Sequence, residues 1–397
     1  MPEPLLYLKA MGASAIISAM CVLVMVGPRR TTSSAWLNAA CVLAIGFGLA
    51  YGCDALALRW IWPPAKGLDR FLMIVMPTVL GIELMAGYPS VPRWIAWSLR
   101  ATLAAATPRI LLHGSVYLSG ADHHWTSWET GISLVVSGVL LAGTWGLLTW
   151  LSQRSAGVSI PLTLGLTTQC AGLTVMMAGY LKGGAAAFPL AATIVATAIA
   201  ARLIAKRSGA PANFGSPAII GIGVVALFGV LFIGRFFGRL STGAAVAMLL
   251  APLLCWFTEL PSLGHRKPWL VGLVRLTLVA IPLLVVLAVA KREFDRKMAP
   301  LIGRPSVSMP IMNGTNPRDV MCHHLCGPAS PTPGSGFRRN PPTLNLDTPR
   351  HVALPVLMTR SARSRQPSAR IASELTRSFM IARCRPSSSV DASPVST

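Results

Sequence analysis

Six polar side chains stand inside long apolar stretches of the sequence, where the surroundings cannot solvate them. They are Asp54, Glu83, Arg100, Arg109, His113 and Gln169. A charged group inside a lipid bilayer costs about 3 kcal/mol or more, so its presence needs a reason. We take these six residues as candidates for a substrate or proton path. The structural alternative is that the charges form static ion pairs that hold helices together.

The depth of each charge within its apolar stretch predicts which charges pair. At about 1.5 Å of rise per residue, Asp54 and Arg109 lie near one membrane face, and Glu83 and Arg100 lie nearer the other. We therefore predict the pairs Asp54–Arg109 and Glu83–Arg100. On a straight helix the two arginines point to opposite sides, so each would face a different neighbour, unless Pro108 kinks the helix between them.

Ten apolar segments are long enough to position these residues in a bilayer, which needs about 20 residues per helix. The sequence therefore predicts an all-α, polytopic integral membrane protein. The segments are Leu5–Val26, Ala35–Leu58, Phe71–Gly87, Pro92–Tyr117, Gly131–Leu151, Val158–Leu181, Gly184–Ile204, Pro217–Gly234, Gly243–Leu260 and Trp269–Ala290. An alternative has nine spans, with the arginine-rich and tryptophan-rich Pro92–Tyr117 lying along the membrane surface.

Composition and tryptophan placement support the membrane class. Apolar residues make up 53% of the chain and charged residues only 12%, about half the share usual in soluble domains. Ten of the eleven tryptophans fall near segment ends, as in an aromatic belt, and only Trp145 lies well inside one. The net charge of +22 is attributed to headgroup anchoring rather than to nucleic acid. We expect a multi-pass protein of the bacterial inner membrane, with the lipid bilayer as its partner and an unknown oligomeric state.

Rows of small residues run through several segments. Gly48 and Gly52 form a GxxxG motif, and Gly221, Gly223 and Gly229 line a later segment. In lipid, such rows let helix backbones approach closely, so tight packing is the prediction and a gating hinge is the alternative. Gly183, directly after Lys182, is interpreted as the stop signal of the sixth segment.

The character of the chain changes near Met298. Residues 301–397 contain 12 Arg, no Lys and 4 acidic residues and have no apolar run of membrane length. We therefore predict a helical membrane domain over residues 1–297 and a disordered tail over 298–397. Another hypothesis, from composition alone, is that this tail is a frame-shifted and non-native sequence.

Few residues favour metal or cofactor chemistry. The loop with Asp122, His123, His124 and Glu129 lacks a second ligand cluster, and the cysteine–histidine run around Cys322 is half a zinc site at best. Nucleotide-binding and hydrolase motifs are absent from the sequence, so we expect no metal and no cofactor.

The leading functional hypothesis is a permease or secondary-transporter-like protein for an unknown small solute. The alternative is a non-transporting membrane scaffold or complex subunit with purely structural ion pairs. An enzyme is the least favoured class, because histidines and acids are scarce. Transport predicts that the paired charges border a polar cavity, whereas a scaffold predicts that they are sealed.

Overall fold

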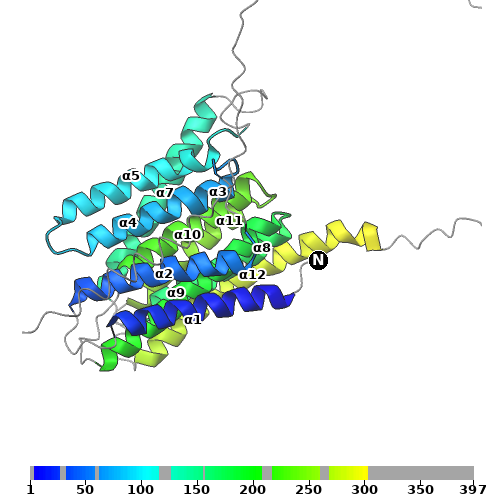
Figure 1. Cartoon of the computed structure of the whole chain (residues 1–397). Helices are drawn as coiled ribbons and strands as arrows, with labels where there is room; N and C mark the ends of the chain where they lie inside the picture. Colours follow the sequence, from blue (N-terminus) through cyan, green and yellow to red (C-terminus); the bar gives the residue numbers. More distant parts are fainter. Residues whose placement is uncertain are drawn as a thin grey trace, which may run out of the picture. The chain divides into compact units, whose positions relative to one another are not determined.

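Each of the ten apolar segments contains helix in the computed structural model (Figure 1). The structure describes residues 4–26, 33–58, 62–115, 127–154, 157–207, 217–259 and 268–302. The elements are α1 (Pro4–Val26), α2 (Ser34–Ala55), α3 (Gly67–Arg70), the π-helical η1 (Phe71–Val75), α4 (Met76–Ala86), α5 (Arg93–Leu112), α7 (Ser127–Arg154), α8 (Ser159–Met177), α9 (Leu181–Arg207), α10 (Pro217–Phe236), α11 (Thr242–Leu250), the 3₁₀-helical η2 (Ala251–Glu259) and α12 (Pro268–Ile302).

The predicted all-α class is confirmed for the described residues, which are helical with no strand among them. Eight helical segments there are long and apolar enough to cross a membrane, with α11 and η2 forming one of them. The remaining two are the unbroken run α3–η1–α4 and the more polar α5. The tail after Ile302 and most of the histidine-containing loop lie outside the described residues.

Helix α10 lies in the interior, and its sequence explains why. Every residue from Ala218 to Gly234 is buried, and a helix that is apolar on all sides belongs inside a bundle. Its glycines face different neighbours: Gly223 meets Leu164 of α8, and Gly229 meets Phe71 of η1. Helices α2, α4, α7, α8 and α9 pack against it.

The predicted tight packing at Gly48 and Gly52 is confirmed. A Cβ on Gly48 would clash with Ser18 of α1 and Thr193 of α9, and the next glycine of the motif lies likewise between α1 and α9. The hydroxyl of Ser18 donates to the backbone oxygen of Ala44 at 3.1 Å. Close backbone approach with interhelical hydrogen bonds is how helices associate in lipid.

Two helix boundaries differ from the predictions. Helix α8 ends at Met177, and Gly179 with φ 92° follows it in the left-handed region that glycine adopts without penalty. Gly183 therefore does not stop a helix but lies within α9. At the other end of the domain, α12 continues to Ile302, beyond the predicted segment end at Ala290.

The π-turn η1 precedes Pro77. A proline ring clashes with the carbonyl four residues earlier and lacks an N–H. The wider turn places the N–H of Met76 on the oxygen of Phe71, five residues back. This accommodates the proline without breaking the run from α3 to α4.

Consecutive helices run in alternating directions, which defines two ends of the bundle. We call the end where α1 begins the first face and the other the second face. At the first face, Arg70 of α3 donates to the carbonyl of His113 at the end of α5, and the N–H of Arg239 donates to Ala178 after α8 at 3.0 Å. The beginning of α1 and the end of α12 lie on the same side in Figure 1.

Candidate functional site

Glu83 and Arg100 form the predicted ion pair between α4 and α5. The Arg100 Nε donates to Glu83 Oε1 at 2.9 Å, and its Nη2 donates to Oε2 at 2.7 Å. The two side chains are only 1% and 8% exposed. A bidentate guanidinium–carboxylate pair has the geometry that best offsets desolvation of both charges.

Five helices hold this pair in place. Asn38 of α2 donates to the backbone oxygen of Glu83 at 3.0 Å and so fixes the last turns of α4. On the other side, the Arg100 guanidinium lies 5.2 Å from the ring centre of Trp97 and 5.8 Å from that of Trp145 on α7. Both contacts are within cation–π range, so the arginine is held by hydrogen bonds in its plane and by aromatic rings around it.

Gly221 of α10 leaves the room that the carboxylate occupies. A Cβ at this position would overlap Glu83 Oε1 and lie 2.9 Å from the indole nitrogen of Trp145. That indole N–H is buried, and no described residue accepts a hydrogen bond from it. The central helix therefore presents a glycine to the charges, and a polar N–H adjoins them without a partner.

The predicted Asp54–Arg109 pair is wrong. Both side chains are exposed, and no ion pair joins them among the described residues. Helix α2 packs on α1, α9 and α4, whereas α5 packs on α7 and α4, so α4 separates the two helices (Figure 1). Equal depth in the membrane is therefore not enough to predict an ion pair, because depth does not give the lateral positions of the helices.

The two other candidate residues lie away from the pair. His113 is exposed and caps the end of α5, where its carbonyl accepts from Arg70. Gln169 lies on α8, and its Nε2 approaches the sulfur of Met11 on α1 at 3.7 Å. The structure thus brings together only Glu83 and Arg100 of the six candidates.

Sequence reasoning missed four residues of the site: Asn38, Trp97, Trp145 and Gly221. Asn38 lies inside an apolar segment, and a single amide there is only a weak indication of a functional site. Trp145 is a stronger indication, because it is the single tryptophan away from a segment end. Gly221 belonged to a row predicted to pack tightly, with a gating hinge as the alternative, and its particular neighbour depends on the rotation of α10.

A second polar cluster lies at the second face around Arg275, which is 4% exposed. Its Nε donates to Thr258 at 2.6 Å, its Nη1 to Ser159 at 3.0 Å and its Nη2 to Glu259 at 2.5 Å. The contact between Arg275 and Glu259 is also a salt bridge. It fastens α12 to η2 and α8, so its role in the structure is the attachment of α12.

A cavity of about 590 Å³ opens at the first face. It lies between the ends of α1, α2, α3 and α9, and its polar walls include Lys66, Asp69, Tyr180 and Lys182. Burial, and secondarily the charge of Asp69, raises the pKa of Tyr180. Neither Glu83 nor Arg100 lines this cavity, nor the cavities beside α11 and α12.

No group of three or more metal-ligating side chains occurs among the described residues. No protein-family description matches the sequence, and no curated protein is significantly similar to it.

Proposed function

We propose that this chain is a non-transporting component of a membrane, a scaffold or complex subunit, in which Glu83 and Arg100 lock α4 and α5 to the helical core. The observation that supports this proposal is the burial of the Glu83–Arg100 pair. A relay or solute site needs access from at least one face, whereas these side chains are nearly inaccessible and are saturated by each other.

The same proposal includes ten spans, with α5 crossing the bilayer. Helix α5 packs along α4 and α7, and a Cβ on Gly138 of α7 would lie 3.4 Å from the backbone oxygen of Ala104. A helix lying in the headgroups would leave Arg100 with water as its partner. Instead, Arg100 is buried against α4, which supports a spanning helix. We also propose that the protein resides in the bacterial inner membrane, and membrane fractionation tests this location.

A permease is the second candidate, supported by the 590 Å³ cavity at the first face. Its size falls within the range of small-molecule sites, and it offers lysine, aspartate and tyrosine side chains. The cavity is separate from the ion pair, so a transport route through it would use residues other than the predicted ones.

A double-mutant cycle with a functional readout tests whether the Glu83–Arg100 pair is purely structural. Glu83→Gln or Arg100→Met alone leaves one buried group without its partner, which costs about 3–5 kcal/mol. We therefore expect both single variants to be poorly expressed or unfolded. The double variant Glu83→Gln/Arg100→Met removes both charges, and we expect it to recover expression and a monodisperse elution profile.

The decisive measurement is whether the double variant restores the phenotype of a strain that lacks the gene. A structural pair predicts restoration. Recovery of folding without restoration of the phenotype would instead assign the charges a direct role in a relay or in solute binding. The matched control is Arg93→Gln, which removes an exposed cation from the start of the same helix and should change neither folding nor phenotype.

A further inference from the structure

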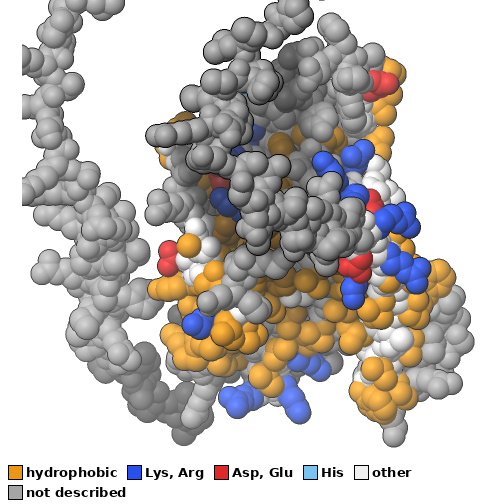
Figure 2. All heavy atoms as spheres, turned by 90° about the vertical axis from the view of Figure 1, so that its right-hand side faces the viewer, with side chains coloured by type: hydrophobic (Ala, Val, Ile, Leu, Met, Phe, Trp, Pro, Cys, Tyr) orange, Lys and Arg blue, Asp and Glu red, His pale blue; other side chains and the backbone are white. Residues whose placement is uncertain are grey.

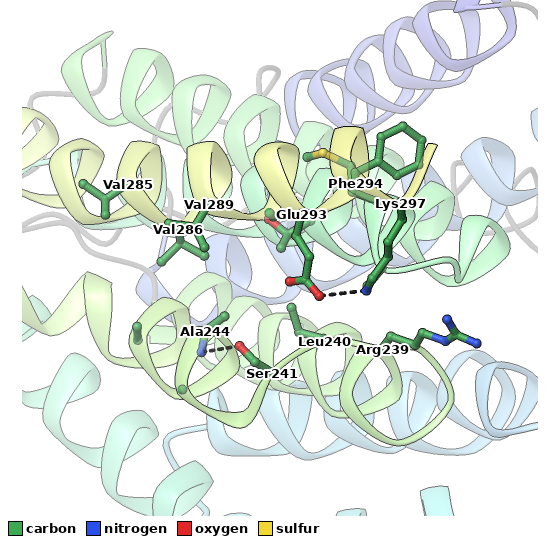
Figure 3. A pocket seen from close by; sticks show the side chains of 16 residues that line it. Arg239, Leu240, Ser241, Ala244, Val285, Val286, Val289, Glu293, Phe294 and Lys297 are labelled. Atoms are coloured by element: carbon green, nitrogen blue, oxygen red, sulfur yellow. Dashed lines mark hydrogen bonds and ion pairs between the residues drawn. The ribbon is translucent and has the colours of Figure 1, made fainter. Parts of the chain in front are cut away.

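A pocket of about 250 Å³ lies at the first face, between the end of α8, the start of α11 and the last turns of α12 (Figure 3). It is separate from the ion pair and from the larger cavity at the same face. A second cavity of about 510 Å³ adjoins it and shares Arg239, Phe294 and Lys297 as walls. The two cavities therefore lie on either side of a common cationic wall.

The pocket has one polar end and one apolar end. Figure 3 shows Arg239, Glu293 and Lys297 at one end and Val285, Val286 and Val289 toward the other. Val285 and Val289 are 59% and 58% exposed, so the apolar end faces the hydrocarbon that surrounds α12. A site of this kind fits a molecule with a charged head and an apolar chain.

The charges at the polar end favour an anionic head. Lys297 Nζ binds Glu293 Oε1 at 2.7 Å, which neutralises the only acid among the pocket walls. The Arg239 side chain is exposed, and no described residue accepts a hydrogen bond from its guanidinium. Its planar set of donors matches two oxygens of a phosphate. The start of α11, capped by Ser241, adds the positive end of a helix dipole.

We propose that this pocket binds one anionic phospholipid, with its phosphate on Arg239 and Lys297 and part of one acyl chain along the valines of α12. The volume of about 250 Å³ holds a section of a chain rather than a whole lipid, and the remainder lies in the bilayer. Cations at headgroup level attract anionic lipids, and burial of part of an acyl chain adds to the binding.

Native mass spectrometry of the full chain, released from nanodiscs with equal amounts of phosphatidylglycerol and phosphatidylcholine, tests the proposal. The wild-type chain should retain phosphatidylglycerol in preference to phosphatidylcholine. The variant Arg239→Gln/Lys297→Gln should lose this adduct by about tenfold, because both charge-assisted contacts disappear. Both positions are exposed, so the fold should persist, and the elution profile checks this.

The matched control is Lys291→Gln/Arg292→Gln, which removes one lysine and one arginine from exposed positions of α12 outside the pocket. Its adduct should change by less than about twofold. Equal loss in both double variants would show attraction by surface charge alone and overturn the site. Equal retention of phosphatidylcholine would also overturn the proposal, because the pocket would then not select an anionic head. Displacement of the adduct by soluble glycerol phosphate would overturn it as well, because binding would then not need an acyl chain.

Discussion

Arg100 donates two hydrogen bonds to the buried carboxylate of Glu83, so removing either charge leaves the other buried without its partner. The space for this contact comes from a residue that carries no side chain. Gly221 of α10 faces the carboxylate closely enough that a single methyl group would displace it. The pair and the glycine are therefore one unit of structure.

We predict that Gly221→Ala lowers the free energy of unfolding by about 1–3 kcal/mol, as overpacking of a buried site does. Chemical unfolding in detergent micelles, followed by tryptophan fluorescence, measures this change. The control is Gly81→Ala on α4, where an added Cβ meets nothing within 4 Å. There alanine should raise stability by up to about 1 kcal/mol, and equal effects at both positions would contradict the proposed packing.

Depth along the chain was enough to predict one of the two ion pairs. Glu83 and Arg100 belong to helices that are adjacent in sequence and in space, so equal depth brought them together. Asp54 and Arg109 have α4 between them, and nothing in the sequence gives the lateral order of three helices. The rotation of each helix about its own axis could not be predicted from the sequence either. Trp145 was therefore identified as an exception but was not placed beside Arg100.

At the scale of elements, α12 differs from α10 in how it is held. Residues such as Leu273, Ile281 and Leu284 are 53–62% exposed, so α12 leaves much of its apolar surface uncovered by other helices. Its firm attachment at the second face is the hydrogen-bonded Arg275. The apolar segments in the sequence were equally good indications of α10 and of α12. Hydropathy alone, however, could not distinguish the central α10 from the peripheral α12.

The packing of α12 on α8 can be tested with an engineered disulfide. A Cβ on Gly272 would lie 3.9 Å from the Cβ of Ser159, close to the usual separation in disulfides of about 3.8 Å. In a background without native cysteines, Ser159→Cys/Gly272→Cys should cross-link on mild oxidation, seen as a mobility shift that reductant reverses. The pair Gly243→Cys/Gly272→Cys joins opposite faces and should not cross-link, and a Cβ on Gly243 meets nothing within 4 Å. Absence of a bond in the first pair would contradict the contact.

At the scale of the whole helical unit, alternating directions place the beginning of α1 and the end of α12 at the same face. Figure 2 views the molecule from that side of Figure 1 and shows lysine and arginine side chains beside broad apolar surface. An even number of crossings is required for this arrangement. The ten apolar segments predicted such a bundle, but the polar composition of α5 left the count open between nine and ten.

Reporter fusions test the count directly. We predict that a reporter placed before Pro4 and one placed after Ile302 give the same sidedness, because ten crossings return the chain to its starting side. A reporter in the turn between α4 and α5, at Ser90, should give the opposite sidedness and serves as the control. Opposite results for the two ends would favour nine crossings, with α5 on the membrane surface.

The contact between α4 and α5 also bears on how the chain enters the bilayer during synthesis. A helix with arginine near its middle is a poor substrate for insertion on its own, since the charge must leave water unaccompanied. Glu83 precedes Arg100 by 17 residues across a short turn, so both leave the ribosome together. If the two helices pair in the insertion channel, they partition as one hairpin in which the charges of Glu83 and Arg100 neutralise each other. The ion pair then serves biogenesis before it serves the folded protein.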